Sequence, residues 1–251
     1  MPMPKRLLLL CLVFTALAES PAFVSRLVAQ PTAAEALPPP RTEYYGRRIA
    51  RTMHFTGAPW LVRDSRNREE EPQKLLDALA LKPGQLICDM GCGNGFYAVQ
   101  LAQRVGPKGT IYAVDIQPEM LDQLKVRAKR YGVRNIHPTL GTVVDPKLPA
   151  RKLDLVLMVD VYHEFSHPEI MLRAIRKSLK ADGHLVFVEF REEDPDVPIK
   201  PLHKMSKRQI IKEAAANGFE LVRQFDELPW QHVMTFVPSE KRPSEPAPDR
   251  E

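Results

Sequence analysis

The sequence contains little cysteine, which limits the metal chemistry that it predicts. Only three cysteines, Cys11, Cys88 and Cys92, occur among 251 residues. No C-x-x-C pair is present, so the ligand spacing of a structural zinc site is missing and we expect no metal. A disulfide between Cys88 and Cys92 would have to bend the glycine loop between them, so we expect both to be free thiols.

The sequence also lacks a strong excess of charge of one sign. Its formal net charge is +5, and removal of Lys5 and Arg6 with the leader described next lowers this value to +3. Such a mild charge does not indicate a nucleic-acid-binding protein. The sequence also has no internal repeat, so solenoid and propeller architectures are not expected.

No hydrophobic run in the sequence reaches the length of about 20 residues that a transmembrane helix usually needs. The longest, Leu7–Ala18, follows two basic residues and ends in Ala16-Leu17-Ala18, an A-x-A cleavage site. This pattern is typical of a secretory signal peptide, so we expect an exported chain, periplasmic or secreted, without a stable membrane anchor. The alternatives are a misassigned start, which would leave the protein in the cytoplasm, or an uncleaved apolar tail.

Composition divides the chain into five parts. Alanine and proline dominate the segment after the leader, which we expect to be a disordered linker. The next segment mixes aromatic and basic residues, and it is either an arm packed on the sheet edge or a lid over a pocket. In that segment His54, Phe55, Trp60 and Arg63 are candidate contacts to the substrate. The expected parts are a signal peptide (1–18), a linker (19–42), an arm or lid (43–71), a folded domain (72–238) and a disordered tail (239–251).

The stretch LICDMGCGNGFYAV, from Leu86 to Val99, carries the clearest motif. A short apolar run ends in Asp89, and three glycines follow at alternate positions before a helical pattern begins, namely Gly91, Gly93 and Gly95. This order predicts strand, tight turn and helix, in which glycine lets a ligand approach the backbone closely. The next strand ends in Asp115, 20 residues after Gly95, a spacing at which a carboxylate binds ribose hydroxyls.

Two cofactors are compatible with a glycine loop and a ribose-binding acid. The dinucleotide fingerprint G-x-G-x-x-G differs from the G-x-G-x-G found here, and Asp89 would repel a pyrophosphate at the helix N-terminus. S-adenosylmethionine has no phosphate, and its ammonium and sulfonium groups are attracted by a carboxylate. Charge therefore favours S-adenosylmethionine over a nicotinamide dinucleotide.

The segment Asp89–Gly95 followed by Asp115 resembles the first two motifs of the class I S-adenosylmethionine-dependent methyltransferases, and the resemblance extends over residues 72–238. It implies an α/β fold, a Rossmann-like, doubly wound, seven-stranded and mostly parallel sheet with an antiparallel last strand. It also implies that Asp89 helps to hold the amino group of the cofactor, that the glycines let the cofactor lie over the loop, and that Asp115, followed by Ile116, binds the ribose.

The strand pattern agrees with that architecture. Strands that alternate with helices predict a parallel sheet covered on both faces, with ligands at the carboxyl ends of the strands. The run Leu153–Val159 is nearly continuous in apolar residues, as in a central strand buried on both faces. Asp89, Asp115 and Asp160 all end predicted strands.

The third and fourth strand ends carry the remaining candidate residues. Family members often have a Gly-Asp pair for the adenine amino group, but here the pair is Gly141-Thr142, so either Thr142 or Asp145 is expected to contact the adenine. The segment after Leu153–Val159 contains His163 and Glu164, which we assign as candidate catalytic residues. His163 is a potential general base, since a free imidazole titrates near neutral pH. The alternative is that the pair only shapes the pocket, and two adjacent side chains cannot point the same way along an extended chain.

The interpretation is a methyltransferase (EC 2.1.1.-) that uses S-adenosylmethionine, together with Asp160 as a further cofactor contact. A small-molecule acceptor is expected because no additional nucleic-acid- or protein-binding domain is visible. The alternatives are a nicotinamide-dependent oxidoreductase and an exported cofactor-binding protein without turnover. The acceptor and the oligomeric state do not follow from the sequence, nor does the way in which an exported enzyme would obtain a cofactor that is made in the cytoplasm.

Overall fold

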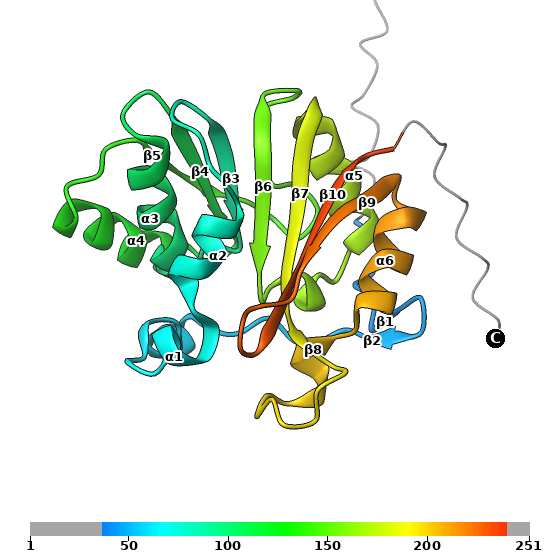
Figure 1. The fold of residues 1–251 in the computed structure, drawn as a ribbon. Coiled ribbons are helices and arrows are strands. Elements are labelled where there is room, and N and C mark those ends of the chain that lie inside the picture. Colours follow the sequence, from blue (N-terminus) through cyan, green and yellow to red (C-terminus); the bar gives the residue numbers. More distant parts are fainter. Residues whose placement is uncertain (1–36, 240–251) are drawn as a thin grey trace, which may run out of the picture. The chain divides into compact units, whose positions relative to one another are not determined.

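The computed structural model describes residues 37–239 (Figure 1). The chain divides by its internal contacts into residues 1–39 and 40–251, and the second unit carries all the described helices and strands. The predicted signal peptide, the linker up to residue 36 and the tail from residue 240 lie outside the described residues. These parts of the domain organisation therefore stay predictions.

The predicted α/β sheet, seven-stranded and mostly parallel, is confirmed. Its strands lie in the order β5-β4-β3-β6-β7-β10-β9, and the short strand β8 pairs in parallel with the end of β7. Strand β10 runs antiparallel to both β7 and β9, which gives the expected antiparallel last strand. The strands are β3 (Leu86–Met90), β4 (Thr110–Asp115), β5 (Ile136–Leu140), β6 (Leu153–Val159), β7 (Leu179–Arg191), β8 (Lys204–Met205), β9 (Phe219–Phe225) and β10 (Gln231–Pro238).

The helices begin where local chemistry favours a helix start. Pro118 and Pro168 occupy first-turn positions, where the missing N–H costs no hydrogen bond. The Ser206 side chain accepts a hydrogen bond from the N–H of Gln209, as expected for an N-cap. The main helices are α2 (Pro72–Ala78), α3 (Phe96–Val105), α4 (Pro118–Arg130), α5 (Pro168–Ser178) and α6 (Lys207–Ala216), and the 3-10 turns are η1 (Phe55–Val62), η2 (Tyr162–Glu164) and η3 (Pro201–His203).

Two hydrophobic cores form on the two faces of the sheet. In β6, Leu155 and Leu157 pack with residues of α2, α3 and α4, whereas Val156 and Met158 pack with residues of α5 and α6. All four side chains are buried, and full burial of each contributes about 1.5–3 kcal/mol to folding. This two-sided burial explains the continuous apolar run of β6.

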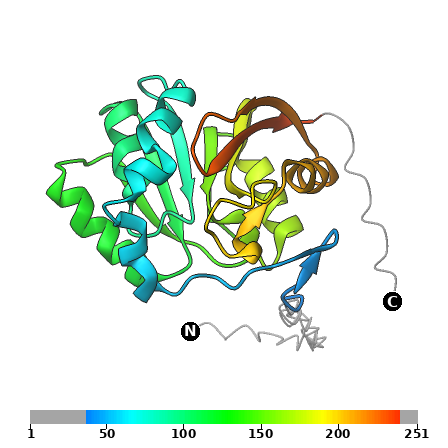
Figure 2. The ribbon, with the colours of Figure 1, turned by 60° about the horizontal axis from the view of Figure 1, so that its bottom comes forward.

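The segment before α2, residues 43–71, is called the arm here. It contains β1 (Glu43–Tyr44), β2 (Arg47–Arg48), η1 and α1 (Arg66–Glu70), and it crosses the carboxyl edge of the parallel strands (Figure 2). The arm thus lies over the edge at which a ligand of this fold would bind.

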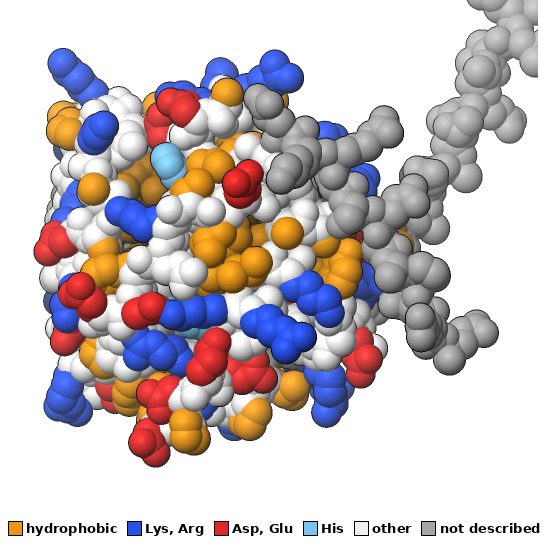
Figure 3. Space-filling model, turned by 45° about the vertical axis from the view of Figure 1, so that its right-hand side comes forward, with side chains coloured by type: hydrophobic (Ala, Val, Ile, Leu, Met, Phe, Trp, Pro, Cys, Tyr) orange, Lys and Arg blue, Asp and Glu red, His pale blue; other side chains and the backbone are white. Residues whose placement is uncertain are grey.

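The face that carries α6 and β9 shows basic and acidic side chains interspersed with hydrophobic ones (Figure 3).

Candidate functional site

A cavity of about 500 Å³ opens at the carboxyl edge of the sheet. Its walls come from the ends of β3, β4 and β6, from η2, from the arm, and from the segment between β7 and β8. Most of the wall side chains are apolar. The cavity-lining residues used below are Met53, Trp60, Leu61, Arg66, Gly91, Gly93, Asp115, Ile116, Thr142, Asp160, His163, Glu164, Phe165, Phe190 and His203.

The glycine loop takes a backbone conformation that side chains disfavour. Gly91 and Gly93 have φ values of +68° and +52°. A Cβ atom at Gly91 would clash with Val161, and one at Gly93 would lie 2.5 Å from the Leu61 side chain of the arm. The loop therefore needs glycine both for its left-handed conformation and for close packing against η2 and the arm.

Asp115 fixes the glycine loop to the end of β4. One carboxylate oxygen accepts a hydrogen bond from the N–H of Gly93 at 2.9 Å, and the other accepts one from the N–H of Gln117 at 2.9 Å. Burial raises the pKa of Asp115, while these backbone hydrogen bonds lower it. Because Asp115 and Ile116 also line the cavity, they lie where the sequence expects a ribose contact.

Asp89 lies behind the glycine loop and is only 3% exposed. Within residues 37–239 its Oδ2 atom has no hydrogen-bond partner. Burial and the neighbouring Asp115 raise the pKa of Asp89 to about 7, and Arg66 opposes that rise. Asp89 is not itself part of the cavity wall, which begins at the following residues, Met90 and Gly91.

Asp160 faces the cavity directly at the end of β6. It takes a left-handed conformation with φ of +50°, which is uncommon outside glycine. Its Oδ2 accepts a hydrogen bond from Gln231 at 2.7 Å, but Oδ1 has no partner within the described part of the chain. The buried Asp89 and the half-buried Asp160 thus each place one buried, unsatisfied oxygen close to the glycine loop, an arrangement that suits a cationic ligand.

The two candidates for an adenine contact separate in the structure. Thr142 lines the cavity, and its hydroxyl accepts a hydrogen bond from the N–H of Asp145 at 2.9 Å. The Asp145 carboxylate instead accepts from the N–H of Lys147 and does not line the cavity. The geometry therefore favours Thr142.

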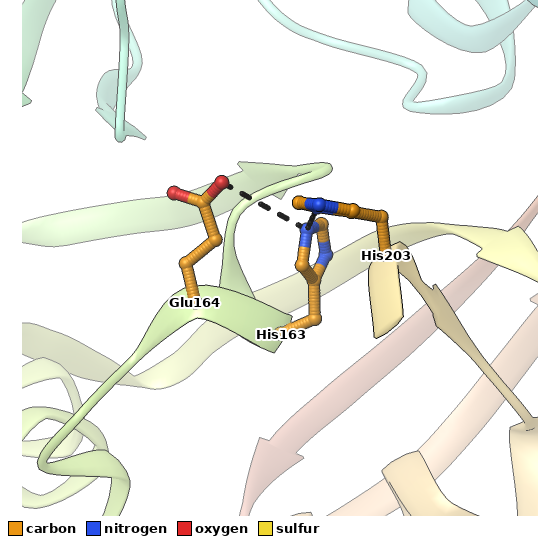
Figure 4. Close-up of side chains that lie close together, drawn as sticks. All are labelled: His163, Glu164 and His203. Atoms are coloured by element: carbon orange, nitrogen blue, oxygen red, sulfur yellow. Dashed lines mark hydrogen bonds and ion pairs between the residues drawn. The ribbon is translucent and has the colours of Figure 1, made fainter. Parts of the chain in front are cut away.

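His163 and Glu164 both face the cavity, because the chain after β6 turns into η2 and does not stay extended. Adjacent side chains diverge only along an extended chain, and the chain is not extended here. The Nδ1 atom of His163 lies 2.7 Å from Glu189 Oε2, and its Nε2 atom lies 3.0 Å from Nδ1 of His203 (Figure 4). Burial opposes protonation of His163, but Glu189 outweighs it and the pKa of His163 is raised.

Glu164 connects η2 to the arm. Its Oε1 accepts a hydrogen bond from the backbone N–H of Met53 at 3.2 Å. Burial raises the pKa of Glu164 to about 7, against the opposing effect of His163. A carboxylate and two imidazoles, those of His163 and His203, therefore meet in one part of the cavity.

The arm is both anchored to the domain and part of the cavity wall. Arg47 forms an ion pair with the buried Glu213 at 2.7 Å, and the Asn94 side chain donates to the carbonyl of Ala58 at 3.1 Å. Trp60 and Met53 contribute to the wall. The arm therefore packs against the domain and also forms part of the cavity wall, so the packed-arm and lid interpretations do not exclude each other.

The other three candidate substrate contacts in the arm have partners within the chain. Arg63 bonds to Glu69 at 2.7 Å and to Glu70 at 2.6 Å. The His54 side chain caps η1, and the N–H of Phe55 donates to Gln117 at 2.8 Å. Arg63, His54 and Phe55 are not part of the cavity wall, so of the four candidates only Trp60 lies where a substrate in the cavity would touch it.

Sequence reasoning missed Glu189 and His203. Glu189 lies within the apolar run of β7 and is fully buried, and a lone acid in such a strand is a usable signal because a buried charge needs a partner. His203 lies 40 residues after His163, in an irregular segment that carries no recognisable motif. Only the tertiary fold brings His203 to the site.

The expectations on cysteine and membrane insertion can be compared with the described residues. Cys88 and Cys92 are buried free thiols, as predicted. Among residues 37–239 no helix is both long enough and apolar enough to cross a membrane.

Residues 81–235 match a family described as "Methyltransferase domain". The fold resembles the crystal structure of an S-adenosylmethionine-dependent methyltransferase from Aquifex aeolicus, with a TM-score of 0.70 and 24% identity, covering 74% of this chain and 99% of the other. At this identity the likeness shows the fold.

Similarity to characterised proteins extends to several kinds of acceptor. Aklanonic acid methyltransferase DauC from Streptomyces sp. (strain C5) is 33% identical over 34% of this chain and 39% of its own length. Nocamycin O-methyltransferase from Saccharothrix syringae is 36% identical over 34% of this chain and 30% of its own length. The chain thus spans well under half of these two relatives. A fibrillarin-like rRNA/tRNA 2'-O-methyltransferase from Aeropyrum pernix is 30% identical over 79% of this chain and 84% of its own length.

Proposed function

This chain belongs to the S-adenosylmethionine-dependent methyltransferases, and from that premise we propose that it methylates a small molecule bound in the cavity beneath the arm. Its cofactor is S-adenosylmethionine, and its reaction class is EC 2.1.1.-. The family match removes the oxidoreductase alternative. What remains to be proposed is the place of the cofactor, the nature of the acceptor and the site of action in the cell.

The residues around the glycine loop fit the cofactor. The unsatisfied carboxylate oxygens of Asp89 and Asp160 would attract its cationic groups. Asp115 would accept hydrogen bonds from ribose hydroxyls, and Gly91 and Gly93, which line the cavity, would lie next to the cofactor. When bound, S-adenosylmethionine supplies an electrophilic methyl group on a sulfonium centre.

The observation that carries the acceptor proposal is the polar group His163, Glu164 and His203 in a largely apolar cavity of limited volume. Each of these side chains can accept a proton from an acceptor hydroxyl, amine or thiol. Glu189 forms a hydrogen bond with Nδ1 of His163 and so fixes the orientation of the ring. The Nε2 atom of His163 then faces His203, which lines the cavity.

The apolar walls supply positioning and exclude water. Trp60 from the arm lies in the same cavity as Phe165 and Phe190 from the sheet side. Such walls hold an acceptor close to the reacting methyl group, and alignment of two reactants can account for several kcal/mol of a barrier. The volume of about 500 Å³ lies within the range of small-molecule sites.

The relatives support a small molecule only in part. Aklanonic acid and nocamycin methyltransferases are named for small molecules, whereas other relatives are named for protein L-isoaspartate and for rRNA or tRNA. The cavity of about 500 Å³ and the arm residues in its wall favour a small-molecule acceptor for this chain. A nucleic-acid acceptor would need a longer basic surface than a net charge of +5 indicates.

Methyl transfer from S-adenosylmethionine labelled in its methyl group tests the acceptor. We would incubate the purified full chain with metabolite, protein and RNA fractions of the source cells, with the Asp115→Ala variant as the control for cofactor use. Label in the metabolite fraction, reduced with Asp115→Ala at a cofactor concentration below saturation, would support the proposal. Label confined to protein or RNA would overturn it, and tight cofactor binding without transfer to any fraction would favour a binding protein.

We also propose that the chain is exported, from the leader pattern at residues 1–18. Mass spectrometry of the protein from its native host should then find a new N-terminus near Glu19. Intact peptides from Met1 to Lys5 in a cytoplasmic fraction would contradict export, and they would also remove the question of cofactor supply.

A further inference from the structure

His163, Glu164 and His203 form a cluster with the geometry of ligands to a metal ion. One potential ligand atom from each residue lies within 4.8 Å of the other two. The Nε2 atom of His163 is 3.0 Å from Nδ1 of His203 and 4.0 Å from Oε1 of Glu164 (Figure 4). We propose that these three side chains bind one divalent transition-metal ion, of which Zn²⁺ is the best match.

The distances fit such an ion. Imidazole nitrogens bind zinc at about 2.0–2.1 Å, so two of them in a tetrahedral set lie about 3.3–3.4 Å apart. The nitrogens of His163 and His203 lie 3.0 Å apart, so a movement of a few tenths of an ångström would admit the ion between them. Glu164 comes from the same 3-10 turn as His163, and a shift of about 1 Å of its flexible carboxylate would complete the set.

Glu189 supplies the outer support that metal-binding histidines usually have. It is fully buried, and its Oε2 atom lies 2.7 Å from Nδ1 of His163. Its other oxygen accepts a hydrogen bond from the N–H of Tyr162 at 3.0 Å, which fixes the carboxylate in place. A carboxylate on one ring nitrogen directs the lone pair of the other nitrogen outward and strengthens it as a ligand.

The donor set selects among metals. Two imidazoles and one carboxylate suit zinc and neighbouring transition metals, whereas magnesium and calcium prefer oxygen ligands alone. The carboxylates of Glu164 and Glu189 would offset the charge of the ion. Three protein ligands also leave a position open, and all three residues line the cavity, so the open position would face it.

The role of the ion rests on the proposed function. An acceptor hydroxyl or thiol at the open position would lose its proton to water more readily, because the cation stabilises the resulting anion. The ion would thereby replace His163 as the group that activates the acceptor. The site would then restrict acceptors to those with a metal-binding heteroatom.

Zinc binding by the metal-stripped full chain tests the site without any methyl transfer. We expect one tightly bound Zn²⁺ per chain in competition with a chromophoric chelator, and visible absorption typical of nitrogen ligation when Co²⁺ replaces it. His203→Ala should weaken zinc at least about tenfold, and Glu189→Gln about 10–100-fold. His137→Ala, at an exposed histidine of β5, is the matched control and should bind zinc as the wild type does.

Two outcomes would overturn the site: no zinc bound by the wild type, or equal zinc affinity in wild type and in a folded His203→Ala variant. Glu164→Gln provides a second test, because it removes a ligand charge without shortening the side chain. Titration of S-adenosylmethionine in the presence of chelator separates this proposal from the proposed function. Cofactor binding by a chain that binds no zinc rejects only the metal site, and zinc binding by a chain that binds no cofactor rejects only the cofactor site.

Discussion

The two sides of the cavity are built from the chain in different ways. The side proposed for the cofactor, called the cofactor side, consists of a glycine loop and the next strand end, which are neighbours in sequence and are joined by the hydrogen bond from Gly93 to Asp115. The side proposed for the acceptor, called the acceptor side, joins residues that are far apart, with 111 positions between Met53 and Glu164 and 40 between His163 and His203. One side is therefore defined by a local motif and the other by the tertiary fold.

This difference predicts how each side responds to change. A local motif on a buried parallel sheet keeps its geometry as long as the sheet is folded. An assembly of distant segments depends on every anchor that closes its loops. We therefore expect changes in the arm to affect stability and the acceptor side, and changes in the motif to affect the cofactor.

The largest effect is expected at the anchor of the arm. Arg47 forms a bidentate pair with Glu213, at 2.7 and 3.0 Å, and Glu213 is fully buried. Arg47→Ala would leave this carboxylate without its cation, so the free energy of unfolding should fall by about 3–5 kcal/mol. Denaturant titration measures this loss.

Arg48→Ala is the matched control, because Arg48 is the exposed neighbour in the same strand. A similar small loss in both variants would show that the pair with Glu213 does not hold the arm. Cofactor affinity of folded Arg47→Ala sharpens the comparison, since it should stay within a few-fold of the wild type if the two sides are independent.

The second effect is a pH dependence of cofactor binding. A cationic ligand favours ionised Asp89, whose pKa burial and Asp115 raise to about 7 in the free protein. Well below that pH the ionised fraction falls tenfold per unit, and from half ionised at pH 7 it falls to about 1% at pH 5, so affinity should weaken about 50-fold. Isothermal titration at several pH values measures the slope. Asp89→Asn should reduce it by about one logarithmic unit per pH unit, and an unchanged slope would exclude Asp89 as the cause.

The third effect concerns Asp115. Its carboxylate is expected to bind ribose hydroxyls, and it also holds the glycine loop through Gly93. Hydrogen bonds to a charged group contribute about 1.5–3 kcal/mol, so Asp115→Ala should weaken S-adenosylmethionine binding about tenfold or more. Asp122→Ala, at an exposed acid of α4, should leave the affinity unchanged. Equal affinity of the folded Asp115→Ala and wild-type proteins would reject the ribose contact.

The same difference explains what could be predicted from the sequence. The sheet, its antiparallel last strand and the buried strand Leu153–Val159 followed from periodicity, because burial on two faces leaves a continuous apolar run. The glycine loop and Asp115 followed from spacing. His203 could not be assigned, since no local pattern states that η3 packs beside η2.

The acceptor side also depends on local geometry that the sequence does not reveal. The orientation of His163 and Glu164 depended on whether the chain after β6 stayed extended, and only the structure shows η2. Arg63 pairs with Glu69 and Glu70, which lie six and seven residues further along the chain in α1. These ion pairs form only because the arm turns back between Arg63 and α1. In each case a small change of backbone course decides which way a side chain points.

The smallest effect tests a close contact between the arm and the glycine loop. Gly93 has φ of +52°, and a Cβ atom added to it would lie 2.5 Å from the side chain of the arm residue Leu61. Gly93→Ala should lower the free energy of unfolding by about 1 kcal/mol for the left-handed backbone, with a further loss from the contact with Leu61. Only the second loss depends on the arm, so the double variant Gly93→Ala/Leu61→Ala should be more stable than the sum of the single variants predicts. Denaturant titration of the four proteins completes the cycle. Strict additivity would mean that Leu61 moves away from Gly93 at no cost, and this contact would then not couple the arm to the loop.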